Sequence, residues 1–220
     1  MDRDIVILAI SEKYGNYCVA GIDINTGEWV RPYSDIKNIA GAVPEEHLIC
    51  DNGSRAKIFD VVRIKFEQPC YNTIQPENFY YNQSKKWRYI DKLTLNKTIL
   101  IHDFDYRDEI FFSYDRRLTQ EEIDAVIKKE SLLILYVTNL EVIVKVSNRD
   151  GHKQYKLNFE CEGINYSEFA IGDITIRELF KDKKAGSYKF CDKAIIVFSL
   201  TDKFRDDKYY KMAAQFIIWK

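Results

Sequence analysis

The sequence predicts a mainly β protein with a few short helices, and three observations support this fold class. Apolar runs of strand length recur along the chain, beginning with residues 5–10, which are rich in β-branched side chains. Tyr and Phe are abundant, at 15 and 13 residues, whereas Gly and Pro number 9 and 4, a balance that is typical of strand-rich proteins. A helical pattern near mid-chain, at residues 118–129, divides the 220 residues into two halves. We therefore expect two small β domains, residues 1–115 and 116–220.

The N-terminal half opens with a predicted three-stranded meander. Residues 5–10 form a continuous apolar run that is typical of a buried strand, and residues 17–24 form a second strand. An Asn-Thr-Gly turn leads into a third strand, residues 28–33. Because strand side chains alternate, Trp29 and Arg31 are expected on one face of this third strand.

Shorter elements are predicted in the rest of this half. Residues 44–50 begin with Pro and continue with two acidic residues, a pattern that favours a short helix. A strand is expected at residues 57–66. Residues 70–92 are rich in Tyr, Asn, Gln and Lys, and we expect an ordered loop or short helix there. One more short strand is predicted at residues 98–102.

The helix at residues 118–129 is the clearest helical pattern in the chain. Thr119 and Glu122 have the spacing of a capping box, in which each side chain bonds a backbone amide of the other. Ile123, Val126 and Ile127 follow as an apolar stripe, and two lysines stand at the negative end of the helix dipole.

The C-terminal half is again rich in strand patterns. In residues 154–162, four apolar side chains alternate cleanly with polar ones. Asp173 is positioned to cap a short helix at residues 174–180. The remaining predicted elements are strands at residues 132–137, 141–146, 194–200 and 209–219 and a turn at residues 148–151.

An internal echo links the two ends of the chain. Residues 9–14 and 199–204 have the same order of residue classes: small, aliphatic, hydroxyl, acid, Lys and aromatic. After a loop, residues 17–21 and 210–214 also agree: aromatic, variable, apolar, Ala and small. This similarity suggests two copies of one hairpin and two related β modules; chance similarity among hairpins is the alternative. A plain tandem duplication would place the copies at equal offsets. The halves are therefore expected either to be differently connected or to swap a hairpin.

Composition and charge limit the classes of function. The chain has 33 basic and 34 acidic residues and a formal net charge of −1. This balance argues against nucleic-acid binding by the whole surface, so any such binding requires a local basic patch. The N-terminus does not resemble a signal peptide, and no apolar run has the length of a membrane span. We therefore expect a cytoplasmic protein that does not insert into membranes.

The cysteines indicate neither a disulfide framework nor a zinc site. Their number is odd, and none of them forms a C-x-x-C pair. Reduced thiols that pack as small apolar side chains are expected at Cys18, Cys50, Cys70, Cys161 and Cys191.

Several sequence blocks occur in a combination that is similar to a known family. They are residues 17–21 with 27–34 (Gly-Glu-Trp-Val-Arg-Pro-Tyr-Ser), Gln75-Pro-Glu-Asn78, and residues 198–204 with 209–213. With these blocks the chain resembles the dual OB-containing domain family of bacterial proteins along nearly its whole length. It departs from the family at Asp202 and Lys203, where Gly-Glu-Pro-like residues are expected.

The resemblance implies both a fold and a function. It implies two OB-like Greek-key β-barrels packed as one unit, and nucleic-acid binding within a bacterial defence or stress-response system. An OB barrel has five strands and binds oligonucleotides across its second and third strands and the loops beside them. Aromatic rings stack on bases there, while Lys and Arg follow the phosphates.

Two groups of residues are candidates for such contacts. Trp29 and Arg31 would form a stacking platform with a phosphate contact; the alternative is that Trp29 plugs the barrel with Arg31 stacked on it and paired internally. The second group alternates basic and aromatic side chains or adds positive charge near mid-chain, and comprises Lys85, Lys86, Trp87, Arg88, Arg116 and Arg117. A charged hairpin with one packed Trp is the alternative for residues 85–89.

Evidence for catalysis is weak in the sequence. His102, Asp103 and Asp105 form the one local cluster suited to a divalent ion, but no second His lies nearby. The chain has no Gly-x-Ser-x-Gly motif and no glycine-rich phosphate loop. We therefore assign no catalytic residue, metal or cofactor.

Three hypotheses about function follow. The first is a non-enzymatic module that binds single-stranded or structured DNA or RNA. The second is a protein-interaction adaptor within a multi-gene system, which would expose an apolar or mixed patch. The third is a small-ligand sensor or enzyme, which would need a deep pocket near residues 102–105.

Overall fold

The structure is a computed structural model that describes residues 1–71, 74–105, 109–147, 151–204 and 206–219. It divides into two compact units, Met1–Asp103 and Phe104–Lys220. Residues 104–105 and 109–115, which the sequence analysis assigned to the first domain, cluster with the second unit. Two contacts explain this placement: the Asp105 carboxylate accepts a hydrogen bond of 2.9 Å from the Ile134 amide, and the Ser113 carbonyl accepts one from the Lys211 ammonium.

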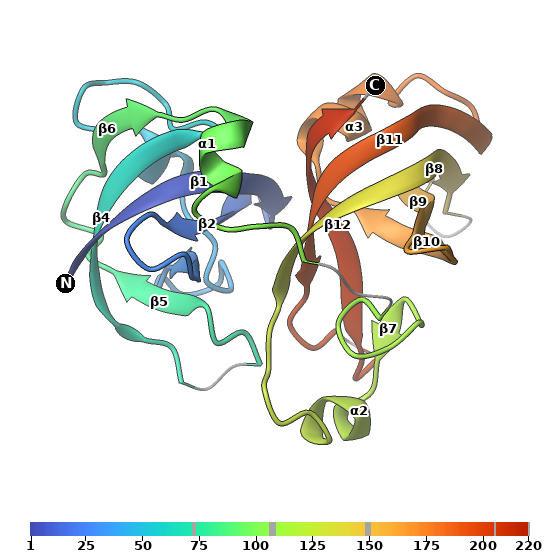
Figure 1. The fold of residues 1–220 in the computed structure, drawn as a ribbon, viewed down its shortest axis with the longest axis horizontal. Helices are drawn as coiled ribbons and strands as arrows, with labels where there is room; N and C mark the ends of the chain where they lie inside the picture. Colours follow the sequence, from blue (N-terminus) through green and yellow to red (C-terminus); the bar gives the residue numbers. More distant parts are fainter. Residues whose placement is uncertain (72–73, 106–108, 148–150, 205, 220) are drawn as a thin grey trace. The chain divides into compact units, whose positions relative to one another are not determined.

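The first unit is a closed five-stranded barrel with one added strand (Figure 1). Its strand order is β1-β2-β3-β5-β4, and β4 pairs with β1 to close the ring. The added strand, β6, pairs with the first residues of β4. β3 and β5 run parallel, and the other pairs are antiparallel. The strands are β1 (Asp2–Lys13), β2 (Asn16–Asp23), β3 (Trp29–Tyr33), β4 (Asp60–Pro69), β5 (Asn78–Tyr81) and β6 (Arg88–Lys92).

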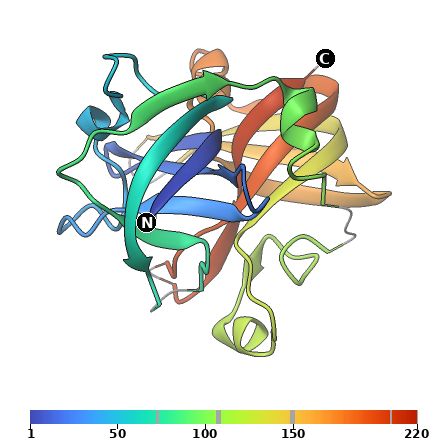
Figure 2. The same cartoon turned by 60° about the vertical axis from the view of Figure 1, so that its left-hand side comes forward.

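The second unit repeats this connectivity in a ring of five strands (Figure 2). Its order is β8-β9-β10-β12-β11, and β11 pairs with β8; the short β7 adds to β12. The third and fifth strands of the ring, β10 and β12, are again the parallel pair. The strands are β7 (Arg117–Leu118), β8 (Leu132–Val146), β9 (Lys153–Cys161), β10 (Ile164–Ile171), β11 (Gly186–Leu200) and β12 (Tyr209–Trp219).

Both units thus have the 1-2-3-5-4-1 strand order of an OB barrel, and the predicted fold class is confirmed. A short helical element stands between the third and fourth strands of each ring: the 3₁₀ helix η1 (Glu45–Leu48) in the first and α3 (Ile174–Leu179) in the second. Both had been predicted from their capping patterns. Each inserts one fully buried residue, Leu48 or Ile176, into its unit.

The interior of each ring is apolar. In the first unit, side chains of β1, β2, β3 and β4 that include Ile5, Val19, Val30 and Val62 form one buried cluster. In the second, Phe159 lies at the centre of a group of aromatic rings, with its centroid 5.1–5.3 Å from the rings of Tyr166, Phe169 and Phe198. Aromatic side chains therefore form a large part of the core of the second unit.

The two remaining helices differ from the prediction. No strand forms at residues 98–102. A helix, α1 (Leu95–Ile99), covers residues 98 and 99, and turns follow it. The Thr94 hydroxyl caps α1 by accepting a bond from the Lys97 amide. The mid-chain helix has the predicted capping box at Thr119 but ends at Asp124, so α2 is Gln120–Asp124. The stripe does not continue, since Ile127 is fully exposed.

Several strands were missed, and one was divided. β5 and β6 lie in the region predicted as loop or short helix, and β10 was not predicted, because these short strands carry mixed polar and aromatic side chains without clear alternation. The two strands predicted at residues 132–137 and 141–146 are one strand, β8, interrupted by a bulge. The predicted turn at residues 148–151 falls mostly outside the described residues.

The internal echo has a different meaning from the one expected. One copy is the β1–β2 hairpin, which joins the first and second strands of its barrel. The other is the β11–β12 hairpin, which joins the fourth and fifth strands. Because both barrels have the same connectivity, the halves are neither differently connected nor related by a swapped hairpin. The similarity is between two hairpins at different barrel positions.

Candidate functional site

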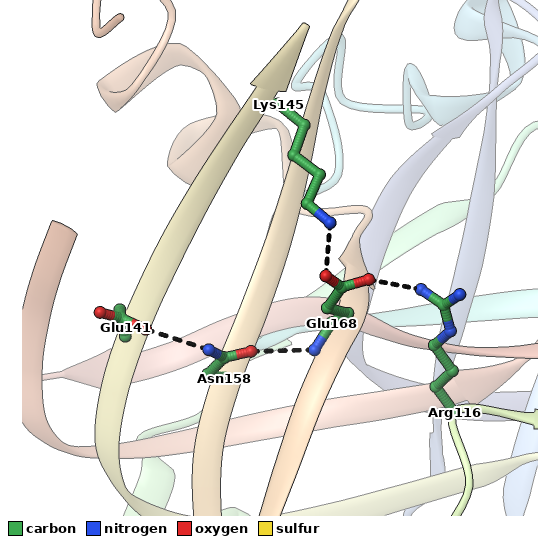
Figure 3. A network of polar contacts seen from close by, with 5 residues as sticks. All are labelled: Arg116, Glu141, Lys145, Asn158 and Glu168. Carbon is green, nitrogen blue, oxygen red and sulfur yellow. Dashed lines mark hydrogen bonds and ion pairs between the residues drawn. The ribbon is translucent and has the colours of Figure 1, made fainter. Parts of the chain in front are cut away.

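The outer face of β8, β9 and β10 in the second barrel carries a cluster of charged side chains (Figure 3). Arg116, just before β7, donates from Nη1 to Oε2 of Glu168 at 2.7 Å. Lys145 of β8 donates from Nζ to the other carboxylate oxygen of Glu168. Lys156 of β9 is paired with Ala170 of β10, two residues from Glu168 on the same face. We call these four residues the cation cluster; it contains three basic side chains and one carboxylate.

Asn158 holds the backbone of β10 beside this cluster (Figure 3). Its Oδ1 accepts a hydrogen bond of 2.9 Å from the Glu168 amide, and its Nδ2 donates to Glu141 of β8 at 3.0 Å. Glu168 lies at a bulge in β10, where the register with β9 shifts, and its φ is +61°. The amide of Asn158 therefore connects three strands at the point where the regular ladder is interrupted.

The charged groups of the cluster shift one another's pKa values. Burial, together with the nearby Arg116 and Lys145, lowers the pKa of Lys156, whereas Glu168 opposes this effect. The hydrogen bond from Lys145 holds the pKa of Glu168 below its usual range, and the nearby cations add to this effect. The carboxylate is thus fully ionised at neutral pH and offsets one of three positive charges. The cluster has a net positive charge suited to an anionic ligand.

A hollow of about 440 Å³ lies beside the cation cluster. Bulges in β8, near Asn139, and in β10 interrupt both ladders of β9 at a similar level and so open the surface. Its floor includes Leu140, Phe159 and Tyr166. Its polar lining consists of Asn139, Glu141, Asn158, Asn165, Ser167 and Lys189. Amide and hydroxyl groups of this kind can donate to and accept from the edge of a base or the hydroxyls of a sugar.

In the first barrel, the corresponding second and third strands are less accessible. On β2, Ala20 and Ile22 point away from the core residue Val19, yet both are buried. On β3, Trp29 and Arg31 point away from the core residue Val30. The outer surface of these strands therefore offers little area to a ligand.

Trp29 and Arg31 are both engaged within the first unit. The Trp29 ring contacts His102 edge to face, with centroids 5.5 Å apart, and His102 in turn bonds the Gly27 carbonyl at 2.8 Å. Arg31 is 6% exposed and donates to Asn78 at 3.1 Å. The two family blocks that contain Arg31 and Asn78 are thus joined by a hydrogen bond, in addition to the parallel β3–β5 ladder.

The basic segment at residues 85–88 separates into a core residue and three exposed ones. Trp87 is 1% exposed and packs edge to face on Tyr81 in the core of the first barrel, so its ring is covered. Lys85, Lys86 and Arg88 are exposed on and after the turn between β5 and β6. These three form an accessible basic patch on the first barrel.

The two mid-chain arginines lie in the second barrel. Arg116 is part of the cation cluster. Arg117 is exposed on β7, next to Tyr210 of β12. Of the residues predicted to contact nucleic acid, Arg116 is therefore the one that lies in the same cluster as Lys145 and Lys156.

The segment at residues 102–105 does not form a convergent site. His102 contacts Trp29 and Gly27 in the first unit, whereas Asp105 bonds the Ile134 backbone in the second. Among the residues that the structure describes, no three His, Cys, Asp or Glu side chains gather closely enough to hold a metal ion. Within the same residues, no helix is long and apolar enough to cross a membrane.

All five cysteines are free thiols. Burial raises the pKa of Cys50, Cys161 and Cys191 to about 11 in each case. These three thiols are therefore protonated at neutral pH and act as packed side chains, not as nucleophiles.

Lys145, Lys156 and Glu168 were missed in the sequence. The alternation in residues 154–162 already placed Lys156 and Asn158 on the outer face of a strand. The ladder register was needed to bring them beside Lys145, because β8 and β9 pair Ile143 with Lys156. No pattern in the sequence predicts the bulge at which Glu168 lies.

Comparison with models of protein families gives a match over nearly the whole chain. The model of the dual OB-containing domain matches residues 3–216 of the 220 residues, and thus spans both barrels. No significant match was found among curated proteins or among solved structures.

Proposed function

Because this chain belongs to the dual OB-containing domain family, we propose that it binds single-stranded or structured nucleic acid across β9 and β10 of the second barrel. These are the second and third strands of the ring, the ones that OB barrels use for oligonucleotides. The observation that carries the proposal is the position of the cation cluster and the polar hollow side by side on this face.

The two features suit the two parts of a nucleotide. Arg116, Lys145 and Lys156 would neutralise backbone phosphates, which supply most of the affinity of such complexes. The hollow of about 440 Å³ is within the size range of small-ligand sites, and its amide side chains would bond a base or sugar. No chemical step is needed, so the proposed role is binding, without a cofactor or metal.

The basic patch of the first barrel extends the proposal. Lys85, Lys86 and Arg88 are exposed and would contact the same strand or a second strand. Trp29, Arg31 and Trp87 are left out of the proposed interface because they are packed within the first unit. The family resemblance also supports a cytoplasmic setting in a bacterial defence or stress system, where protein partners would act with this module.

The proposal is tested by measuring the affinity of the purified protein for fluorescent single- and double-stranded DNA and RNA at about 50 mM and about 200 mM salt. Lys145→Gln with Lys156→Gln removes two charges from the proposed site. Lys85→Gln with Lys86→Gln removes two from the first barrel. Lys128→Gln with Lys129→Gln, in an exposed segment after α2, is the matched control.

We expect salt-sensitive binding that falls at least tenfold in the Lys145 and Lys156 variant and little in the control, since two phosphate contacts are lost. Equal losses in all three variants would indicate binding by general charge and contradict the assignment of the site. A failure of the wild-type protein to bind any oligonucleotide at low salt would contradict the function itself and favour the adaptor role.

A further inference from the structure

Glu168 lies between Lys145 and Arg116 in the manner of a bound anion (Figure 3). Its two carboxylate oxygens bond two cations from separate segments, Arg116 before β7 and Lys145 on β8. The charge of Lys156 also lowers the pKa of this carboxylate. One negative charge with two terminal oxygens is also what a phosphodiester presents.

The backbone of Glu168 is held independently of this carboxylate. Its amide donates to Asn158, and Asn158 is fixed in turn by Glu141. The φ of +61° is unusual for Glu and costs about 1 kcal/mol. The β10 bulge therefore presents a long acidic side chain at a position where rotation about its own side-chain bonds would withdraw the carboxylate and leave the strand unchanged.

The ion pairs are open to competition from solvent. The Glu168 side chain is 33% exposed, and those of Arg116 and Lys145 are 40% and 45% exposed. Ion pairs at such positions contribute little to stability. Three neighbouring cations, however, repel one another when no anion stands between them. The site therefore requires an anion but does not require this particular one.

We propose that Arg116, Lys145 and Lys156 form a phosphate-binding subsite, which the Glu168 carboxylate occupies in the free protein and backbone phosphates of the bound strand occupy in the complex. The inference rests on the proposed function and adds to it an internal competitor that weakens binding. Glu168 thereby acts against non-specific anions, because a ligand must gain enough from further contacts to displace it.

The test compares Glu168→Gln with Glu178→Gln in the 220-residue protein. Gln is close to Glu in shape, so the first variant removes the charge and keeps the bulge side chain. Glu178, on α3, pairs with Lys181 outside both the cation cluster and the hollow, so the second variant makes the same charge change as a control. Affinity for a fluorescent single-stranded oligonucleotide is measured over a range of salt concentrations, and thermal unfolding confirms that each variant is folded.

We expect Glu168→Gln to bind about five- to tenfold more tightly than the wild type at low salt, because the phosphates no longer have to displace a carboxylate from the three cations. The slope of log affinity against log salt should change by less than the contribution of one phosphate contact, about 0.7, because the same phosphates are bound in both proteins. Adding Lys145→Gln to this variant should return the affinity to the wild-type value or below it.

Two results would overturn the inference alone. If the wild type binds and folded Glu168→Gln binds no better, Glu168 is a structural ion pair and the phosphate assignment is incorrect. If Glu178→Gln gains as much as Glu168→Gln, the effect is one of net charge. If neither the wild type nor Glu168→Gln binds any oligonucleotide, the proposed function and the inference both fail.

Discussion

At the scale of single residues, buried polar side chains fix the position of irregular segments through hydrogen bonds to barrel strands. Lys211 of β12 is 1% exposed, and its ammonium donates to the Ser113 carbonyl in the segment before β7. Arg31 is similarly buried and donates to Asn78. A buried cation is costly unless it is bonded, so each of these residues ties a distant segment to a barrel strand.

Lys211 leads to a prediction about pH. Burial lowers the pKa of Lys211 from 10.5 to about 7, so between these values the unfolded chain holds a proton that the folded protein has released. Stability must then rise with pH over this window, by up to about 1.4 kcal/mol per pH unit. We expect the free energy of unfolding of the wild type to increase relative to that of Lys211→Met as the pH is raised from about 7 to about 10. Urea unfolding at several pH values measures the difference, and parallel curves for the two proteins would contradict it.

At the scale of elements, short connections depend on single side chains for their position. Asp173 precedes α3 and is 1% exposed. Its Oδ1 accepts from the Ile176 amide, which caps the helix, and its Oδ2 accepts from the Phe216 amide and the Gln215 side chain of β12. One carboxylate thus joins the helix between the third and fourth strands to the fifth strand, although burial raises its pKa.

We therefore predict graded losses of stability at this position. Asp173→Ala removes the cap and the contacts to β12 and should cost about 3 kcal/mol. Asp173→Ser keeps a capping oxygen but does not replace the bonds to Gln215 and Phe216, so it should fall between Ala and the wild type. Chemical denaturation of the three proteins measures the series. Equal stability of the Ser and Ala variants would show that the cap contributes nothing.

The bulge in β10 gives a second prediction at this scale. Because Glu168 has a φ of +61°, glycine suits the backbone there better than alanine does. Glu168→Gly and Glu168→Ala lose the same ion pairs, so the comparison isolates the backbone. We expect the Gly variant to be more stable by about 1 kcal/mol. If the Ala variant is equally stable in urea unfolding, the bulge is not strained.

At the scale of the whole molecule, charge is distributed so that binding must be local. The net charge is −1, with 33 basic and 34 acidic residues. The cation cluster supplies three basic side chains on the second barrel, and general attraction between the rest of the surface and a polyanion is weak. The salt dependence of binding should therefore reflect a small number of phosphates.

This leads to a prediction for the intact protein. With about three phosphate contacts, the slope of log affinity against log salt for a single strand should be about −2. Titrations of one oligonucleotide at four or more salt concentrations provide the slope, and replacing Arg116 by Gln should make it shallower by about 0.7. A slope much steeper than −2 would show that a wider surface, such as the patch at Lys85 and Lys86, engages the same strand.

The sequence by itself determined the β class, most of the long strands, and the caps at Thr119 and Asp173, because alternation, β-branched runs and capping spacings act over a few neighbouring residues. The family blocks determined that there are two OB barrels. What only the tertiary structure decided is which outward side chains become neighbours. Lys145, Lys156 and Arg116 surround Glu168 because strand register, a bulge and a cross-strand contact bring together residues up to 52 positions apart. For the same reason Trp87 and Arg31, which resemble surface contacts in the sequence, lie buried: burial depends on what packs over a strand, and no local pattern records that.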